Sequence, residues 1–132
     1  MRIVIVEDHL MILDALRKAC ERDFGHEVVG QASRGDEALP LILRTQPDVV
    51  ILDLALPEVD GFTVGAEAVK ALPSLRILVL SAHCDPYTLF RVEQSKVHGF
   101  VDKNGNPLTE VDRALRALGE GKCYYSDFYE AA

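Results

Sequence analysis

The chain has 132 residues, of which 48% are hydrophobic and 27% are charged. This length favours one domain with a single core, and a chain of this size needs no disulfide or structural metal in order to fold. Its 14 basic and 21 acidic side chains leave a formal net charge of −7, which opposes binding to the phosphates of nucleic acids. We therefore do not expect this segment to bind DNA by itself.

No apolar run approaches the ~18–20 residues that are needed to cross a bilayer. The first apolar run, residues 2–6, is too short, and too soon followed by acidic residues, to act as a secretory signal. The three cysteines, Cys20, Cys84 and Cys123, are widely spaced and form no C-x-x-C pair, which is typical of reduced thiols in a cytosol. The sequence therefore predicts a cytoplasmic protein without membrane contacts, disulfide bonds or a zinc site.

Short apolar runs alternate with longer amphipathic stretches along the chain. This alternation predicts successive β–α units, and the continuous apolar character of the runs suits a parallel sheet that helices cover on both faces. Five runs are expected to form strands, namely residues 2–6, 27–32, 49–52, 77–80 and 99–101.

Two proline pairs mark the starts of predicted helices. Asp85-Pro86 and Asn106-Pro107 each place a capping residue before a proline at the first helical position. Proline is favourable there because its missing N–H would have no partner within the helix. We expect helices to begin at these two points.

A further helix is predicted to end near Thr45. Ser33, followed by Asp36 and Glu37, resembles a loose capping box at its start. Pro40 lies inside this stretch, and a proline deep in a helix removes one hydrogen bond and clashes with the preceding turn. We therefore expect either a kink or a late start at this helix.

Charged and hydroxyl side chains follow four of the predicted strands. Glu7 and Asp8 come after the first strand, Asp53 after the third and Ser81 after the fourth, while Lys103 lies two residues beyond the fifth. The carboxyl ends of parallel strands share one edge of the sheet, and ligands bind where the strand order reverses. If the first strand lies beside the third, as in the order 2-1-3-4-5, the three acids converge in one crevice.

These three acids and Lys103 together carry a formal charge of −2, and like-charge repulsion disfavours such an arrangement when it is bare. A divalent cation would neutralise it. Carboxylate oxygens without neighbouring histidine or cysteine select a hard ion, and an incomplete set of protein ligands leaves room for the waters that Mg²⁺ retains. Mg²⁺ is therefore the expected cofactor.

Four segments resemble the signatures of receiver domains in two-component response regulators, namely residues 4–9, 49–61, 78–82 and 99–103. The resemblance covers residues 2 to about 121. It implies a flavodoxin-like α/β fold, with a doubly wound, five-stranded parallel sheet in the order 2-1-3-4-5. Residues 1–121 would form the receiver domain, and residues 122–132 a C-terminal tail or the start of a linker to an effector domain.

Two details are most similar to receivers of the NarL/LuxR type. One is the acidic pair followed by His9, and the other is the ending Gly119-x-Gly121-x-x-Tyr124-x-Ser126. Receivers of this type belong to transcription regulators. The resemblance therefore favours a piece of a longer regulator over a stand-alone receiver, although the sequence leaves both open.

The resemblance implies a role for each residue of the acidic edge. Asp53 would be the phospho-acceptor, attacking a phosphohistidine on a sensor histidine kinase or a small acyl phosphate. Glu7 and Asp8 would hold Mg²⁺ together with Asp53 and the backbone carbonyl of Ala55. Lys103 would face the phosphoryl oxygens, because phosphoryl transfer needs little beyond positioning and charge neutralisation.

The resemblance also implies a switch. The Ser81 hydroxyl would donate to a phosphoryl oxygen and draw the loop after the fourth strand inward. Phe100, three residues before Lys103, occupies the aromatic switch position of the family and would turn inward as Ser81 vacates space. Phosphorylation would then favour the state whose donors reach the new oxygens.

Three residues depart from the commoner family pattern. Glu7 replaces an aspartate, which lengthens one of the arms directed at the metal. Ala55 and His83 stand where the family varies its side chains to set the lifetime of the acyl phosphate. Because Ala55 cannot hydrogen-bond a water, slow self-dephosphorylation is expected unless His83 orients the attacking water.

The expected function is a phosphorylation-controlled signalling switch rather than an enzyme. Its partners would be a sensor histidine kinase, a second copy of the chain through the last helices, and DNA only through an effector domain outside this chain. Four aromatic residues near the end would either dock as a short helix or form a contact surface, namely Tyr124, Tyr125, Phe128 and Tyr129.

Three other functions use the same fold or chemistry. A degenerate receiver would serve only as a docking module. An FMN-binding electron carrier needs a phosphate-binding loop after the first strand, where the acids Glu7 and Asp8 stand. A phosphatase of the haloacid dehalogenase type needs a second aspartate two residues after Asp53, where Ala55 stands.

Overall fold

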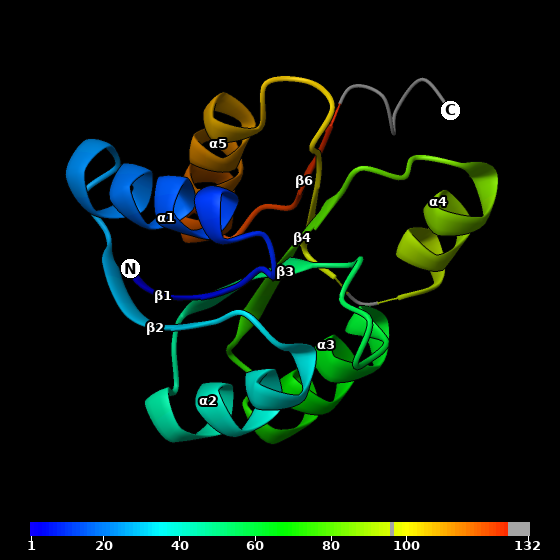
Figure 1. Cartoon of the computed structure of the whole chain (residues 1–132), viewed down its shortest axis with the longest axis horizontal. Helices are drawn as coiled ribbons and strands as arrows, with labels where there is room; N and C mark the ends of the chain where they lie inside the picture. Colours follow the sequence, from blue (N-terminus) through cyan, green and yellow to red (C-terminus); the bar gives the residue numbers. More distant parts are fainter. Residues whose placement is uncertain (96, 127–132) are drawn as a thin grey trace.

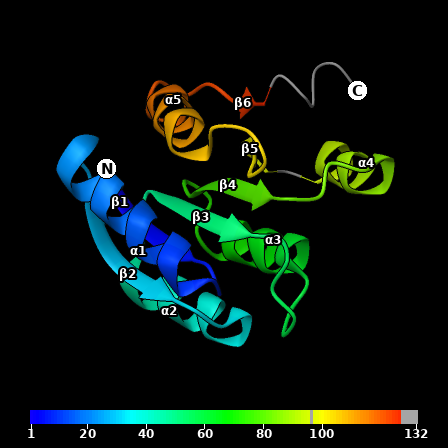
Figure 2. The ribbon, with the colours of Figure 1, turned by 45° about the horizontal axis from the view of Figure 1, so that its top comes forward.

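The structure is a computed structural model of the chain, and it describes residues 1–95 and 97–126. These residues form a six-stranded parallel sheet in the order β2-β1-β3-β4-β5-β6. In Figure 2 the arrows of β2, β3 and β4 point in the same direction. The strands are β1 (Arg2–Val6), β2 (Glu27–Ala32), β3 (Val49–Asp53), β4 (Arg76–Ser81), β5 (Gly99–Asp102) and β6 (Tyr124–Tyr125).

Helices connect the strands and cover both faces of the sheet. Figure 1 shows α1 and α5 on one face, and α2 and α3 on the other. This arrangement is a doubly wound, flavodoxin-like α/β fold. The described helices are α1 (Leu10–Lys18), the π-helical turn η1 (Ala19–Asp23), the 3-10 turn η2 (Gly35–Glu37), α2 (Ala38–Thr45), α3 (Gly61–Ala71), α4 (Pro86–Gln94) and α5 (Pro107–Gly119).

The core is divided by the sheet into two apolar layers. Alternate residues of a strand point to opposite faces, so Ile3 and Ile5 of β1 pack toward α1 and α5, whereas Val4 and Val6 pack toward α2, α3 and α4. Every residue of β3 is buried, because this strand lies inside the sheet and under helices on both faces. The apolar runs of the sequence are therefore the buried centre of the fold.

The five predicted strands are confirmed, and three of them extend further than their apolar runs. β3 ends at Asp53, β4 at Ser81 and β5 at Asp102. Parallel pairing continues through these polar residues, with Asp53 opposite Leu80 and Ser81 opposite Asp102. Backbone hydrogen bonds do not require an apolar side chain, so the ladder carries the polar residues to the edge of the sheet.

Both helix starts predicted from proline pairs are confirmed. α4 begins at Pro86, and the Asp85 carboxylate accepts a hydrogen bond from the backbone N–H of Thr88 at 2.8 Å. α5 begins at Pro107 after Asn106, whose side chain makes no capping hydrogen bond. The fixed backbone angle of proline is therefore sufficient to start α5.

The late start expected near Pro40 is confirmed, but the predicted capping box is wrong. α2 begins only at Ala38, which places Pro40 in its first turn, where a missing N–H costs nothing. The residue that precedes η2 is Arg34 and not Ser33. The backbone N–H of Gly35 is bonded instead to the Glu58 carboxylate at 2.9 Å, so a tertiary contact replaces the local cap.

The sheet has one strand more than the five that were predicted. Residues 124–125, expected to lie in a tail or linker, form β6, with Tyr124 opposite Gly99 and Tyr125 opposite Phe100. A strand of two residues is too short to show any periodicity in the sequence. Its approach depends on Gly99, because a Cβ atom there would lie 3.2 Å from the backbone oxygen of Tyr124. Phe128 and Tyr129 lie outside the described residues.

Within the described part of the chain, no helix is both long enough and apolar enough to cross a membrane.

His98, to which the sequence assigned no role, joins three strands at the start of β5. Its ring Nδ1 accepts a hydrogen bond from the backbone N–H of Ile77 at 3.0 Å, and its backbone N–H donates to the Ile77 carbonyl at 2.9 Å. Its own carbonyl accepts from the backbone N–H of Tyr124 at 3.1 Å. Burial and the charge of Arg76 hold the pKa of His98 below its usual value.

The low pKa of His98 predicts a loss of stability in acid. His98 binds a proton less readily in the folded state than in the unfolded state. The free energy that neutral His98 contributes to folding is therefore fully present above the ordinary pKa near 6.5, and it is lost as the pH falls from there through the lower pKa of the folded state. The variant His98→Asn keeps an acceptor but does not titrate. Urea unfolding at pH 7.5 and pH 5 should show a larger loss of unfolding free energy for the wild type than for the variant. Equal losses of unfolding free energy in the two proteins would show that His98 does not cause the loss of stability in acid.

Candidate functional site

The acidic part of the site lies where β1 and β3 end side by side. The two strands are parallel, with Val6 opposite Leu52, so the next residues along them are Glu7 and Asp53. Asp8 follows at the end of β1. One carboxylate oxygen from each of the three acids lies within 4.8 Å of the others. The structure thus brings together the three acids that the sequence placed at this edge.

Lys103 provides positive charge to this cluster from the loop after β5. Its Nζ lies 2.7 Å from Glu7 Oε1 and 3.3 Å from Asp53 Oδ2. Glu7 and Asp53 are buried, with 0% and 1% of their surface exposed, whereas Asp8 is exposed. The site is therefore a largely buried charge cluster that opens to solvent on the side of Asp8.

The two buried acids differ in their affinity for protons. Burial, followed by the neighbouring Asp53 carboxylate, raises the pKa of Glu7 to about 8 against the opposing effect of Lys103. Burial also disfavours the charged form of Asp53, but the neighbouring Glu7 side chain, the backbone N–H of Ala55 and Lys103 outweigh it and lower the pKa of Asp53. Of the two buried acids, Glu7 is therefore the one that binds a proton more readily.

The donor set fits a hard divalent cation. Glu7 Oε2 is buried and has no hydrogen-bond partner among the described residues. A buried oxygen without a partner is costly, and a bound cation would satisfy it and replace the proton on Glu7. The three acids offer carboxylate oxygens only, which suits Mg²⁺ better than a transition metal.

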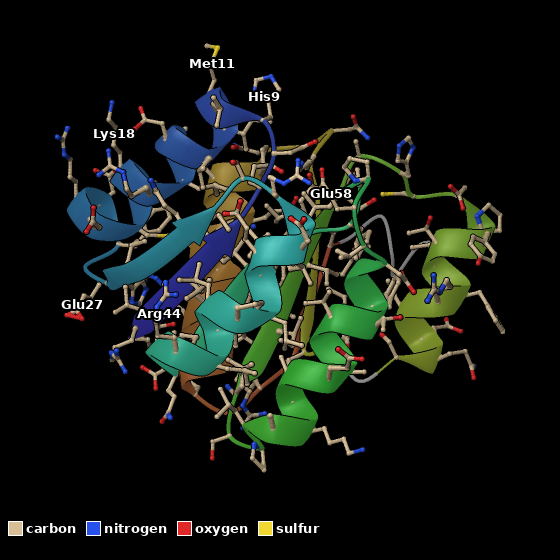
Figure 3. The ribbon with its side chains drawn as sticks, turned by 60° about the horizontal axis from the view of Figure 1, so that its bottom comes forward. His9, Met11, Lys18, Glu27, Arg44 and Glu58 are labelled. Carbon is tan, nitrogen blue, oxygen red and sulfur yellow. The ribbon has the colours of Figure 1, made fainter. Side chains whose placement is uncertain are left out.

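The loop after β3 holds the Asp53 carboxylate in place. The backbone N–H of Ala55 donates to Asp53 Oδ1 at 3.0 Å, and that of Leu54 donates to the Leu80 carbonyl at 3.0 Å. Further along, Glu58 binds the backbone of Gly35 at the start of η2; it is labelled beside this turn in Figure 3. The Ala55 side chain is exposed at this edge and offers no polar atom.

Ser81 lies at the carboxyl end of β4, and its hydroxyl bonds within its own loop. It donates to the His83 carbonyl and accepts from the His83 backbone N–H, both at 2.9 Å. The Ser81 carbonyl accepts from the backbone N–H of Lys103 at 2.9 Å. Ser81 is 2% exposed, whereas the His83 side chain is exposed. The loop after β4 is thus tied to the lysine by its backbone, while its hydroxyl faces His83.

Phe100 lies in the middle of β5 and is fully buried, with 0% of its surface exposed. It packs in the apolar layer that the sheet shares with α2, α3 and α4. Its ring is therefore inside the molecule while Ser81 is still bonded to His83. The switch that the resemblance implies for Ser81 and Phe100 remains a prediction.

Two residues around Lys103 were missed by the sequence reasoning. Asn104 donates from Nδ2 to the Ala82 carbonyl at 2.7 Å, which ties the loop after β5 to the loop after β4. Ser126 accepts a hydrogen bond from the backbone N–H of Asp102 at 2.8 Å. The ending around Ser126 was noticed only as a family feature, because nothing local links it to residues of β5.

The start of α1 forms the rim of the acidic edge. His9 is the residue before the helix, and its Nδ1 accepts from the backbone N–H of Ile12 at 3.4 Å. Figure 3 shows His9 and Met11 projecting outward at this end of α1. His9 is therefore a helix cap, and no contact places it in the charge cluster.

The chain matches the response regulator receiver domain family over residues 3–114. Among curated relatives, the uncharacterized transcriptional regulatory protein YvfU of Bacillus subtilis is 32% identical over 125 residues, which cover 95% of this chain and 62% of YvfU. This chain thus spans less than two thirds of the length of that relative.

Solved structures agree with the sequence relatives. The isolated receiver domain of RcsB from Salmonella enterica, described in the presence of the phosphomimetic BeF3−, has a TM-score of 0.89 at 30% identity and covers 99% of this chain and 96% of its own. The signal receiver domain of the putative response regulator NarL from Mycobacterium tuberculosis has a TM-score of 0.82 at 33% identity and covers 92% of this chain and 97% of its own.

The fold, the acidic cluster and these matches together define a class of signalling domain. The chain belongs to the response regulator receiver family, and its relatives are transcription regulators of the NarL/LuxR type.

Removal of Lys103 should destabilise the metal-free protein. In the variant Lys103→Met, the buried carboxylates of Glu7 and Asp53 lose their cation, and the unfolding free energy should fall by about 2 kcal/mol. This is less than a fully unpaired buried charge would cost, because Glu7 can hold a proton. Urea unfolding at pH 7.5 with a chelator measures the loss.

The matched control is Lys122→Met. Lys122 pairs with Glu120 at 3.1 Å, and both side chains are more than half exposed. Surface pairs contribute little, so this variant should stay within about 0.5 kcal/mol of the wild type. Similar values for the two variants would show that Lys103 does not stabilise the cluster.

Proposed function

We propose that the protein is a phosphorylation-controlled switch whose Asp53 accepts a phosphoryl group from a sensor histidine kinase. The observation that carries the proposal is the buried Asp53 carboxylate, held by the Ala55 N–H and paired with Lys103 inside an acidic cluster. A carboxylate oxygen is the nucleophile. As it bonds to the phosphorus of the phosphohistidine, the bond from phosphorus to the imidazole nitrogen breaks, which leaves an acyl phosphate on Asp53 and a free histidine on the kinase.

Glu7, Asp8 and Asp53, with the backbone carbonyl of Ala55, would hold Mg²⁺. The unpartnered Glu7 Oε2 and the close approach of the three carboxylates support this assignment. When bound, the ion offsets the negative charge that gathers on the transferring phosphoryl group. Asp53 would present its oxygen to the phosphorus, with its carboxylate oriented by the backbone N–H of Ala55.

Lys103 and Ser81 would receive the new phosphoryl oxygens. The Lys103 Nζ exchanges its contact with Glu7 for a phosphoryl oxygen, and the Ser81 hydroxyl exchanges the His83 carbonyl for another. Both donors are already at the carboxyl edge of the sheet, so small movements suffice. Phosphorylation replaces the single charge of the Asp53 carboxylate by the roughly two charges of a phosphoryl group, a net gain of about one, and it brings three acceptor oxygens. It therefore favours the loop arrangement in which these donors reach the new oxygens.

Phe100 would act as the aromatic switch residue. It lies in β5, two residues before the end of the strand at Asp102, after which the loop that holds Lys103 begins. Movement of the loop after β4 changes the space beside the ring, and the altered surface of α4, β5 and α5 would carry the signal outward. We place Phe100 in the switch because its burial joins this surface to the core.

The output would be transcription, through an effector domain outside residues 1–132. Support comes from the relatives, which are longer than this chain and are named as transcriptional regulators. The related RcsB has been solved as two dimers bound to two parallel DNAs, which supports a homodimer and contact with DNA through the effector. Residues 1–121 would be the cytoplasmic receiver, and residues 122–132 would lead toward the effector.

Treatment with acetyl phosphate and Mg²⁺ should add one phosphoryl group to the protein. Intact-mass spectrometry followed by peptide mapping should place this group on Asp53, and the variant Asp53→Asn should not gain it. Omission of Mg²⁺, or the variant Asp8→Asn, should slow the reaction by at least ~10², because a metal clamp supplies much of the charge stabilisation.

The matched control for this experiment is Asp60→Asn. Asp60 lies in the loop after β3 but binds Arg91 at 2.7 Å and is not a member of the acidic cluster. This variant should be phosphorylated like the wild type. A wild-type protein that takes no phosphoryl group would favour the docking-module alternative.

The side chain at position 55 should set the lifetime of the acyl phosphate. Ala55 is exposed and cannot orient an attacking water, so the variant Ala55→Asn should shorten the half-life by at least ~3-fold. The measurement is the loss of phosphoryl mass after removal of acetyl phosphate. The variant His83→Ala should lengthen the half-life if His83 orients the water, and an unchanged half-life in Ala55→Asn would remove the role given to residue 55.

A further inference from the structure

We infer that Ser126 is a positioning residue for Lys103, acting through the backbone of Asp102. Ser126 lies beyond α5, directly after β6. The inference rests on the proposed function of Asp53 and Lys103, and it adds a residue whose side chain never touches the acidic cluster.

Ser126 is bound to two residues of β5. Its hydroxyl accepts a hydrogen bond from the backbone N–H of Asp102 at 2.8 Å, and its backbone N–H donates to the Phe100 carbonyl at 2.9 Å. The hydroxyl also lies 3.3 Å from the Phe100 carbonyl, to which it donates. Only 2% of Ser126 is exposed. A small buried side chain with these bonds occupies a defined position.

The hydroxyl completes a ladder that β6 alone would leave open. Backbone pairing between β5 and β6 ends at Phe100 and Tyr125. Asp102 lies two residues beyond Phe100 in β5, and its backbone N–H donates to the Ser126 hydroxyl. Without the hydroxyl, this amide would lose its acceptor at the residue that directly precedes Lys103.

The end of β5 is therefore held from both sides. Successive amides of a strand point to opposite neighbours. The N–H of Lys103 donates to the Ser81 carbonyl of β4 at 2.9 Å, and the N–H of Asp102 donates to Ser126 on the other side. Together the two bonds fix the backbone from which the Lys103 side chain extends.

The position of that backbone matters for the chemistry. The Lys103 Nζ is 2.7 Å from Glu7 and 3.3 Å from Asp53, and it must reach the phosphoryl group in the transition state. A misplacement of about 1 Å can cost about 10²-fold in rate. Coupling of this kind is reciprocal. If the Ser126 hydrogen bond favours one position of the Lys103 backbone, a shift of that backbone also weakens or strengthens the Ser126 hydrogen bond.

The test compares Ser126→Ala with Ser126→Thr, which keeps a hydroxyl. The full chain is treated with acetyl phosphate and saturating Mg²⁺, and the rate of phosphoryl gain is followed by intact mass. Ser126→Ala should be phosphorylated about 10-fold more slowly than the wild type, with faster hydrogen exchange at the Asp102 amide. Ser126→Thr should stay within about 2-fold of the wild-type rate, because its hydroxyl restores the bond.

A double-mutant cycle separates positioning from a general structural effect. In the background Lys103→Gln, followed over a longer incubation, Ser126→Ala should cause no further slowing, because the group that it positions is absent. The control Tyr124→Phe removes a hydrogen bond to Glu110 from the same strand and should leave the rate unchanged. Tyr124 makes no contact with the acidic cluster among the bonds described for it.

The outcomes test the positioning role of Ser126 separately from the proposed function of Asp53. The role of Ser126 would be overturned if Ser126→Ala slowed the reaction by the same factor in the wild-type and Lys103→Gln backgrounds, or if Ser126→Ala reacted at the wild-type rate. Either result would leave the function of Asp53 intact. A wild-type protein that gains no phosphoryl group would overturn both. Slowing that depends on Lys103 and is rescued by threonine establishes the positioning role.

Discussion

The site depends on the repulsion between carboxylates that parallel pairing forces together. Because β1 and β3 are neighbours in register, the residues that follow them, Glu7 and Asp53, are brought side by side in a buried position. Lys103 offsets part of the charge, a raised pKa on Glu7 offsets another part, and one oxygen of Glu7 keeps no partner. This arrangement of charges is the basis of the proposal that the cluster binds a cation and accepts a phosphoryl group.

Long-range contacts keep this charged edge in place. The loop that follows Asp53 and carries Ala55 is held through Glu58 by the turn before α2. The loop that carries Lys103 is held by the backbone of β4 and, on its other side, by Ser126. The groups of the proposed reaction are thus fixed by strands and turns outside the acidic cluster, an arrangement that suits electrostatic catalysis.

The same contacts explain how a local chemical event can be felt outside the site. The Ser81 hydroxyl can exchange the His83 carbonyl for a stronger acceptor, and the ring of Phe100 lies in the core between this loop and α4. The backbone N–H of Lys103 binds the Ser81 carbonyl, and that of the preceding residue, Asp102, binds Ser126. A shift at the acidic edge therefore has a physical route to the C-terminal end of the described chain.

The sequence by itself determined the β–α order, the core strands, the starts of α4 and α5, and the set of acids at the edge. These features follow from local periodicity, proline geometry and the topology of parallel sheets. Only the tertiary structure decided the sixth strand, the binding of Gly35 by Glu58 and the contact of Ser126 with Asp102. Each of these is a hydrogen bond between residues far apart in the chain, at positions where no local pattern distinguishes a partner from an ordinary polar residue.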